Sequence, residues 1–278
     1  MTIDTRQAVH PDAVRSMDTA TLRRHFLIET LFSPDRIHLT LSHLDRVVIG
    51  GIVPVTRTLA LEAEPSFKAA CFLERRELGV INLGGPGVVR TDGVEHALAK
   101  REAVYVAMGT QQVSFRSDDP DRPARFYLVS APAHARFETV RLPLDKAKTV
   151  SLGEPAKANV RTIYQLIHPE VVQTCQLVMG TTVLESGSIW NTMPCHVHDR
   201  RMEAYCYYDL PEDARVFHFM GEPDQTRHMV VADGQALLSP GWSIHSGVGT
   251  QSYAFVWAMA GENQTFTDMD HVAMADLR

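Results

Sequence analysis

The chain consists largely of short runs of β-forming residues separated by turn-forming residues. Runs rich in Val, Ile, Tyr or Phe and bounded by Gly, Pro or Asp occur at 46–56, 78–83, 103–108, 113–115, 125–130, 206–210, 216–220 and 253–259. Many short strands with frequent turns are typical of sandwiches and small barrels. Helical signal is confined to 22–26, capped by Asp18 or Thr19, and to 169–175. The pattern predicts an all-β protein with a few short helices.

An internal repeat predicts that these strands form two units. The string GTQQVSF at 109–115 is similar to GTQSYAF at 249–255, and an Asp-Gly pair precedes each, at 92–93 and 233–234. Upstream, ERR at 74–76 matches DRR at 199–201. Chance similarity of such short strings is the alternative, but two copies of one β-unit explain the length of 278 residues better than a single fold. We expect an N-terminal unit at 1–150 and a C-terminal unit at 151–278.

Composition argues against several classes of partner. The chain carries 27 Lys and Arg against 33 Asp and Glu, a formal net charge of −6. No cluster of five or more basic residues occurs, so nucleic acid and anionic membranes are poor candidates. Residues 1–19 lack an apolar h-region, and the longest apolar run, 47–55, is too short to span a bilayer. We therefore expect a cytoplasmic protein that acts on a small molecule.

Four residues in the second half have the composition and spacing of a metal site. His196 and His198 are two positions apart, so on a β-strand both side chains project from the same face. On an unbroken strand Glu203 would face away, but the charged stretch at 199–202 can turn the chain and bring the carboxylate back. His245 completes the set. Three imidazoles and a carboxylate suit zinc, manganese, iron or nickel, and they leave up to two positions open on a six-coordinate ion.

Open positions indicate catalysis, because a structural zinc normally has a closed and thiolate-rich shell. A substrate with adjacent carbonyl and hydroxyl groups could chelate such an ion through both oxygens. The cation would then polarise the carbonyl and stabilise an enediolate, as aldose–ketose isomerisation requires. With iron, the same ligands could instead activate dioxygen, and the four residues alone do not choose between these reactions.

The order of these residues resembles the two motifs of the cupin superfamily. The first motif is H-x-H followed, after three or four residues, by Glu; the second is G-x5-P-x-G-x2-H. Gly234, Pro240 and His245 fall at the spacings of the second motif, whereas Trp242 occupies the place of its second glycine. An indole there could line a pocket or pack in the core. The resemblance implies a jelly-roll-like β-barrel for each unit.

The repeat indicates that only the C-terminal unit keeps the metal site. When the two copies are overlaid, the four ligand positions fall on Cys71, Leu73, Leu78 and Tyr105. None of these four side chains offers the imidazole or carboxylate that the second copy has. The N-terminal unit is then expected to contribute packing, subunit contact or the shape of the active-site mouth.

Four longer strings resemble a single family within this superfamily. They are FLERRELGVINLGG at 72–85, WNTMPCHVHDRRME at 190–203, SIHSGVGT at 243–250 and GENQTFTDMDH at 261–271. With the length of the chain, they resemble the 5-keto-4-deoxyuronate isomerases, or 4-deoxy-L-threo-5-hexosulose-uronate ketol-isomerases. The resemblance implies one zinc ion per subunit, held by His196, His198, Glu203 and His245, and a homohexamer.

The same resemblance implies a reaction in the degradation of pectin and other uronate polysaccharides. The family converts 5-dehydro-4-deoxy-D-glucuronate to 3-deoxy-D-glycero-2,5-hexodiulosonate by moving a carbonyl between C1 and C2. An iron-dependent cupin dioxygenase and a non-catalytic sugar-binding cupin are the alternatives. A sensor of the latter kind would be expected to carry a DNA-binding element, and the sequence shows no basic face.

The carboxylate of such a substrate calls for a bidentate arginine rather than bulk positive charge. Of the available arginines we favour Arg161, with Arg200 in the turn between ligands as a second candidate, and Trp242 is a candidate pocket wall. The reaction also needs a group that moves a proton between C2 and C1. The candidates are Glu222 and His228, which flank a polar loop, and Tyr205, which alternates with Glu203 on one strand face.

Overall fold

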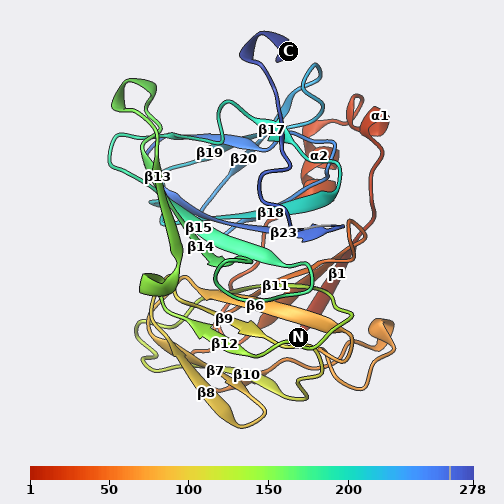
Figure 1. Cartoon of the computed structure of the whole chain (residues 1–278), viewed down its shortest axis with the longest axis vertical. Helices are drawn as coiled ribbons and strands as arrows, with labels where there is room; N and C mark the ends of the chain where they lie inside the picture. Colours follow the sequence, from red (N-terminus) through yellow and green to blue (C-terminus); the bar gives the residue numbers. More distant parts are fainter. Residues whose placement is uncertain (263) are drawn as a thin grey trace. The chain divides into compact units, whose positions relative to one another are not determined.

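The computed structural model describes residues 1–262 and 264–278, which form two compact units (Figure 1). Unit 1 comprises Met1–Thr5, Thr30–Lys148 and Gln165–Met179, and unit 2 comprises Arg6–Glu29, Thr149–Tyr164 and Gly180–Arg278. A single boundary at residue 150 therefore does not describe the division, because each unit also takes a short segment from the other side of it. No helix in the described part of the chain is long and apolar enough to cross a membrane.

Unit 1 is built on a seven-stranded sheet and a four-stranded sheet. The larger sheet has the order β1 (Thr2–Arg6), β3 (Ile37–Ser42), β4 (Val48–Ile52), β11 (Phe126–Pro132), β6 (Arg76–Asn82), β9 (Ala103–Val106) and β12 (Val140–Leu142). The smaller sheet has the order β5 (Leu59–Ala60), β10 (Val113–Ser117), β7 (Gly87–Thr91) and β8 (Val94–Leu98). Buried aliphatic and aromatic side chains from both sheets form one core cluster, as expected for a β-sandwich or barrel.

Unit 2 repeats this arrangement and adds a small third sheet. Its seven-stranded sheet has the order β13 (Lys148–Leu152), β14 (Arg161–Ile167), β15 (Val178–Leu184), β23 (Ala254–Gly261), β18 (Arg201–Tyr208), β21 (Ala236–Ser239) and β2 (Leu27–Ile28). Its four-stranded sheet has the order β16 (Trp190–Asn191), β22 (Ser246–Gly249), β19 (Val216–Met220) and β20 (Arg227–Val231). The added pair is β17 (His196–Val197) and β24 (Asp270–His271).

The helical content is small, as predicted. The two α-helices are α1 (Pro11–Val14) and α2 (Thr19–Phe26), and short 3-10 turns occur at Pro65–Phe67, Leu144–Lys146, Pro155–Lys157 and Met274–Asp276. Asp18 caps α2, because its side chain accepts a hydrogen bond from the Thr21 backbone N–H at 2.8 Å. The all-β prediction and the predicted cap are both confirmed.

The helix predicted at 169–175 is wrong. The buried carboxylate of Glu77 accepts hydrogen bonds from the backbone N–H groups of Cys175, Gln176 and Leu177 at 2.7–2.8 Å, and also from the Tyr105 hydroxyl at 2.9 Å. Three consecutive N–H groups that converge on one carboxylate are not available to a helical ladder. Only a single turn forms at the start of the segment, where the N–H groups of Val171 and Val172 donate to the His168 carbonyl, and the remainder is irregular.

The two units correspond strand for strand, which confirms the predicted duplication. In β6, Arg76 pairs with Pro132 of β11, and in β18, Arg201 pairs with Gly261 of β23. The ERR and DRR strings thus occupy equivalent positions at the start of equivalent strands. Two residues further on, Leu78 is the counterpart of Glu203, as the overlay predicted.

The register predicted from the other pair of strings is wrong. Residues 113–115 lie in β10, whose counterpart is β22, whereas residues 253–255 lead into β23, the counterpart of β11. Val89 and His218 are each the third residue of the equivalent strands β7 and β19, and they pair with Phe115 and Gly247. Phe115 is therefore the counterpart of Gly247. Two residues earlier in each case, the counterpart of His245 is Val113 rather than Tyr105. The similarity of these two strings therefore does not reflect the duplication, because they lie in non-equivalent strands.

Candidate metal centre

The four predicted ligands meet in unit 2. One potential ligand atom from each of His196, His198, Glu203 and His245 lies within 4.8 Å of those of the other three. Residues 199–200 form the predicted turn between β17 and β18, and the chain enters β22 directly after His245. The turn brings Glu203 to the same side as the two histidines, which a continuous strand would not do.

The ligand atoms themselves point toward one another. Nε2 of His245 lies 2.9 Å from Nε2 of His196 and 2.9 Å from Oε2 of Glu203, and Nε2 of His198 lies 3.1 Å from the same carboxylate oxygen. Nitrogen and oxygen ligands about 2.0–2.2 Å from one ion have separations of this order. The donor set therefore fits a divalent cation such as zinc.

Contacts behind the cluster set the orientation of two of its imidazoles. Nδ1 of His198 lies 2.9 Å from the carbonyl oxygen of Arg201, and Nδ1 of His245 lies 3.4 Å from Oγ of Ser239. A carbonyl only accepts hydrogen bonds, so Nδ1 of His198 carries a proton, and in the neutral imidazole Nε2 presents its lone pair to the cluster. Such outer contacts are typical of histidines that bind metals.

Burial and mutual interactions set the charges of the cluster. Burial, assisted by the neighbouring His245, lowers the pKa of His196 to about 3. Burial alone would raise the pKa of Glu203, but His245 and His198 outweigh it and lower that pKa. Burial would lower the pKa of His198, but its hydrogen bond with Glu203 outweighs burial and raises it. A neutral His196 and an ionised Glu203 are the forms that bind a cation.

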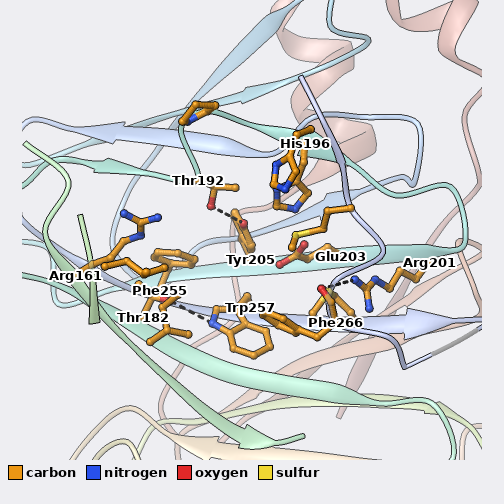
Figure 2. A pocket seen from close by; sticks show the side chains of 16 residues that line it. Arg161, Thr182, Thr192, His196, Arg201, Glu203, Tyr205, Phe255, Trp257 and Phe266 are labelled. Atoms are coloured by element: carbon orange, nitrogen blue, oxygen red, sulfur yellow. Dashed lines mark hydrogen bonds between the residues drawn. The ribbon is translucent and has the colours of Figure 1, made fainter. Parts of the chain in front are cut away.

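A cavity of about 240 Å³ opens onto two of these residues (Figure 2). Glu203, Tyr205 and Arg201 reach it from alternate positions of β18, as residues on one strand face must. The Thr192 hydroxyl lies 3.2 Å from the Tyr205 hydroxyl. The cavity is lined by Leu152, Arg161, Ile163, Thr182, Thr192, Pro194, His196, Arg201, Glu203, Tyr205, Phe255, Trp257, Met259, Phe266, Met269 and His271.

Arg161 supplies a positive charge to this cavity. Figure 2 shows it at one end, with Phe255 and Tyr205 between it and Glu203. Its Nη1 donates to the carbonyl of Asn159 at 2.8 Å, and no carboxylate of the described residues forms an ion pair with it. Burial lowers its pKa, but guanidinium remains charged at neutral pH. Arg161 is therefore a half-buried cation that an anionic ligand can neutralise.

The other two arginines near the cluster already have acidic partners. Arg201 is almost fully buried, and its Nη2 lies 2.6 Å from a carboxylate oxygen of Asp268. Arg200 is exposed and pairs with Glu262 at 2.7 Å, outside the cavity. Of these three arginines, Arg161 alone combines a place in the cavity with an uncompensated charge.

Three further candidates from the sequence do not line the cavity. The carboxylate of Glu222 pairs with Arg15 at 2.7 Å, and the exposed His228 ring lies against Phe217 on the four-stranded sheet. Trp242 is half-buried beside Gly241 and lies outside the cavity lining. Of the candidate proton-transfer groups, the structure leaves only Tyr205 in the cavity.

Sequence reasoning missed the side of the cavity formed by the end of the chain. Phe266, Met269 and His271 line it, and His271 pairs with His196 in the small β17–β24 sheet. The aromatic ring of Phe266 also packs against Trp257 of β23, with centroids 5.5 Å apart. The alternation of 255, 257 and 259 on one face was a usable signal for β23, but the segment after β23 has no periodic pattern that would place it.

Two jelly-roll units in tandem, one of which gathers three histidines and a glutamate, define a two-domain cupin with a candidate metal centre. Solved structures support the fold. An IolB-like protein from Salmonella typhimurium LT2 superposes with a TM-score of 0.68 at 13% identity, covering 81% of this chain and 87% of that one. Bacillus subtilis oxalate decarboxylase gives a TM-score of 0.54 at 10% identity, covering 81% and 71%. At these identities the likeness concerns the fold alone.

The chain belongs to the KduI/IolB family, whose model matches residues 27–274. A relative from Burkholderia cenocepacia, named 4-deoxy-L-threo-5-hexosulose-uronate ketol-isomerase, is 55% identical over 99% of this chain and 100% of its own length. Relatives with the same name from Halalkalibacterium halodurans and Dickeya dadantii are 52% and 50% identical, over 99% and 98% of this chain and 100% and 99% of their own lengths. The family predicted from the four sequence strings is confirmed.

Proposed function

We propose that this protein is a metal-dependent ketol-isomerase of a deoxy-uronate sugar. The reaction converts 5-dehydro-4-deoxy-D-glucuronate (4-deoxy-L-threo-5-hexosulose uronate) to 3-deoxy-D-glycero-2,5-hexodiulosonate, within the degradation of pectin and related uronate polysaccharides. Full-length relatives at 50–55% identity carry the name of this activity. The observation in the structure that carries the proposal is one cavity with the ligand cluster on one side and the uncompensated Arg161 at one end.

The group at the cluster is proposed to be one zinc ion per subunit. His196, His198, Glu203 and His245 would hold it, and their donor types equally accept manganese, iron or nickel. When bound, such a cation supplies a Lewis acid that polarises a carbonyl oxygen and favours loss of a proton from the adjacent carbon. The remaining requirements of the reaction fall to the other residues of the cavity.

Arg161 is proposed to bind the carboxylate of the open-chain substrate. Its planar guanidinium can donate two parallel hydrogen bonds to a carboxylate. With the carboxylate at this end, the C1–C2 end of the six-carbon chain extends past Tyr205 toward Glu203 (Figure 2). The apolar walls provided by Phe255 and Trp257 exclude water from the carbon chain between the two ends.

Tyr205 is proposed to donate a proton to a substrate oxygen. Burial, together with the negative charge of Glu203, raises its pKa well above the ordinary value, so its phenol stays protonated at neutral pH. The Thr192 hydroxyl lies within hydrogen-bonding distance of it and orients the group. A neutral donor of this kind stabilises the oxygen on which charge develops when a proton leaves C2.

Localisation and assembly are proposed from the sequence and the family resemblance. The homohexamer rests on the family resemblance. A cytoplasmic location with a small sugar acid as ligand is consistent with the net charge of −6 and the lack of basic clusters in the sequence. Analytical ultracentrifugation tests the hexamer, and a dimer or monomer at micromolar concentration would contradict it.

The decisive experiment runs the reaction in deuterated water and measures the metal content of the same sample. Deuterium at C1 of the product and about one metal ion per chain are expected, because an enediol exchanges its proton with solvent. Retention of the original hydrogen would indicate hydride transfer. Oxygen consumption by an iron-loaded sample that forms no ketose would overturn the isomerase assignment in favour of a dioxygenase.

A further inference from the structure

Unit 1 contains a cavity of its own, although its described residues form no metal-binding cluster like that of unit 2. The cavity measures about 620 Å³, within the usual range for small-molecule sites. It opens where β6 begins and β11 ends, and Arg76 at this edge is the counterpart of Arg201 at the metal-site cavity. Its lining comprises Thr5, Leu41, Ser42, His43, Arg46, Ser66, Phe67, Ala69, Phe72, Arg75, Arg76, Pro132 and Ala133.

The lining carries positive charge that is only partly compensated. It includes three arginines and one histidine but no aspartate or glutamate. Glu74 pairs with Arg75 at 3.1 Å, which neutralises one of the three arginines. Neither Arg46 nor Arg76 forms an ion pair with a carboxylate of the described residues. Two uncompensated guanidinium groups at one cavity repel each other unless an anion lies between them.

Arg76 is a fixed part of this cavity rather than a mobile surface side chain. Its Nε lies 3.1 Å from the Ser130 hydroxyl, and its Nη2 donates to the carbonyls of Ser130 and Arg46 at 2.8 and 2.7 Å. Its guanidinium also lies 5.5 Å from the ring centroid of Phe67. No hydrogen bond to the described residues uses its Nη1, so that nitrogen is available to a ligand.

Aromatic and hydroxyl groups complete the site. Phe67 and Phe72 lie together in the lining, with ring centroids 5.6 Å apart, and present an apolar surface to the C–H face of a sugar. Thr5 and Ser66 add hydroxyl groups for a polyhydroxylated ligand. A phosphate would call for a cradle of backbone N–H groups or a helix N-terminus, and the lining supplies side-chain cations on an apolar wall instead.

We propose that this cavity of unit 1 is a second ligand site, which binds a small sugar-sized carboxylate without a metal ion. Arg46 and Nη1 of Arg76 bind the carboxylate, and Phe67 and Phe72 contact the carbon frame. The proposal does not depend on the reaction in unit 2, because none of its residues belongs to the metal-site cavity. The duplication then gives the chain one metal site and one carboxylate site at related positions of two equivalent barrels.

Calorimetric titration of the metal-loaded full chain with D-galacturonate tests the site. Arg46→Asn removes the exposed guanidinium while keeping a residue that tolerates the left-handed backbone at this position, where φ is 53°. Its backbone carbonyl still accepts the hydrogen bond from Arg76. Arg90→Asn, at an exposed position of β7 outside the cavity, is the matched control. Arg161→Gln separately removes the proposed carboxylate contact in unit 2.

Binding that persists in Arg161→Gln and in Arg90→Asn, but weakens about tenfold or more in Arg46→Asn, is the expected result, since a charge-assisted contact is lost. D-galactose should not bind at this site, and inorganic phosphate should bind more weakly than galacturonate. Equal weakening by Arg46→Asn and Arg90→Asn would overturn the proposal. So would loss of all binding in Arg161→Gln, or phosphate binding as tight as that of galacturonate.

Discussion

The two units use one strand framework for two different interiors. In unit 2 the positions of the cluster are His196, His198, Glu203 and His245. In unit 1 strand pairing makes Leu78 and Val113 the counterparts of the last two, and the sequence overlay makes Cys71 and Leu73 the counterparts of the first two. These four residues of unit 1 are buried, and three of them belong to its hydrophobic core cluster. The strand order therefore does not determine whether a jelly-roll barrel binds a metal; the side chains at four inward positions do.

Two buried carboxylates have different roles in the two units: one holds a loop in place, and the other belongs to the ligand cluster. Glu77 in unit 1 accepts hydrogen bonds from three backbone N–H groups and the Tyr105 hydroxyl, so its oxygens have no capacity left for a ligand. Among the described residues, the carboxylate of Glu203 in unit 2 forms hydrogen bonds or ion pairs only with the imidazoles of His198 and His245. A fully satisfied carboxylate holds a loop in place, whereas one surrounded by ligand nitrogens can hold a cation.

Removing one ligand from unit 2 is expected to have the largest effect. His245→Ala should lower kcat/KM by about 10³-fold or more and release the metal, because the three remaining ligands hold the ion more weakly. The protein should remain folded, since a catalytic ion contributes less to folding than a closed structural one. Metal analysis, activity and circular dichroism check this.

The matched control for that variant is Val113→Ala at the equivalent position of unit 1. It should cost roughly 1–2 kcal/mol of stability through the lost methyl groups and leave metal content and kcat unchanged. Metal loss in Val113→Ala, or full activity in His245→Ala, would contradict the assignment of the metal to unit 2.

Placing a carboxylate in the interior of unit 1 tests whether one ligand residue is enough to change the character of that unit. Leu78→Glu creates the residue that its counterpart has, but its neighbours are apolar, so an unpartnered carboxylate would be buried among core side chains. The expected cost is several kcal/mol, about 3–5, which endangers folding altogether. Urea denaturation measures it, with Leu78→Met expected to cost less than about 1.5 kcal/mol. A stable Leu78→Glu protein that binds a second metal ion would show that the surrounding residues matter little.

The outcome of the sequence predictions follows from how local each signal is. The H-x-H pair, the turn at 199–200 and Glu203 are close in sequence, so strand alternation together with the turn was enough to bring them together. The Asp18 cap is similarly local. The counterpart of His245 was misplaced because short similar strings do not determine which strands pair, and pairing depends on contacts distant in sequence. Phe266, Met269 and His271 were missed for the same reason, because only tertiary packing places them at the cavity.

The two arginines proposed from the sequence are expected to differ strongly. Arg161→Met should raise KM about 100-fold, because it removes a bidentate contact from a site shielded from water, with a smaller effect on kcat. Arg200→Met removes an equal charge from an exposed ion pair and should leave KM within about twofold of the wild type. Steady-state kinetics at fixed ionic strength compare them. Similar KM values for the two variants would remove Arg161 from the substrate site.

The equivalent arginines at the starts of β6 and β18 lead to the smallest predicted effect. Arg76 in unit 1 is held by carbonyl and hydroxyl oxygens, whereas Arg201 in unit 2 is paired with Asp268, close to Phe266, Met269 and His271 of the cavity wall. Asp268→Asn keeps the size of the side chain but leaves Arg201 without its counter-charge, so this wall should loosen. We expect a loss of about 1–3 kcal/mol in stability and a KM about five- to tenfold higher, because the partner of a mostly buried charge is lost.

Glu262→Gln, in the exposed pair with Arg200, is the control and should change neither quantity. If Asp268→Asn behaved like Glu262→Gln, the ion pair would not position the cavity wall, and the two arginines would be equivalent in role as well as in place.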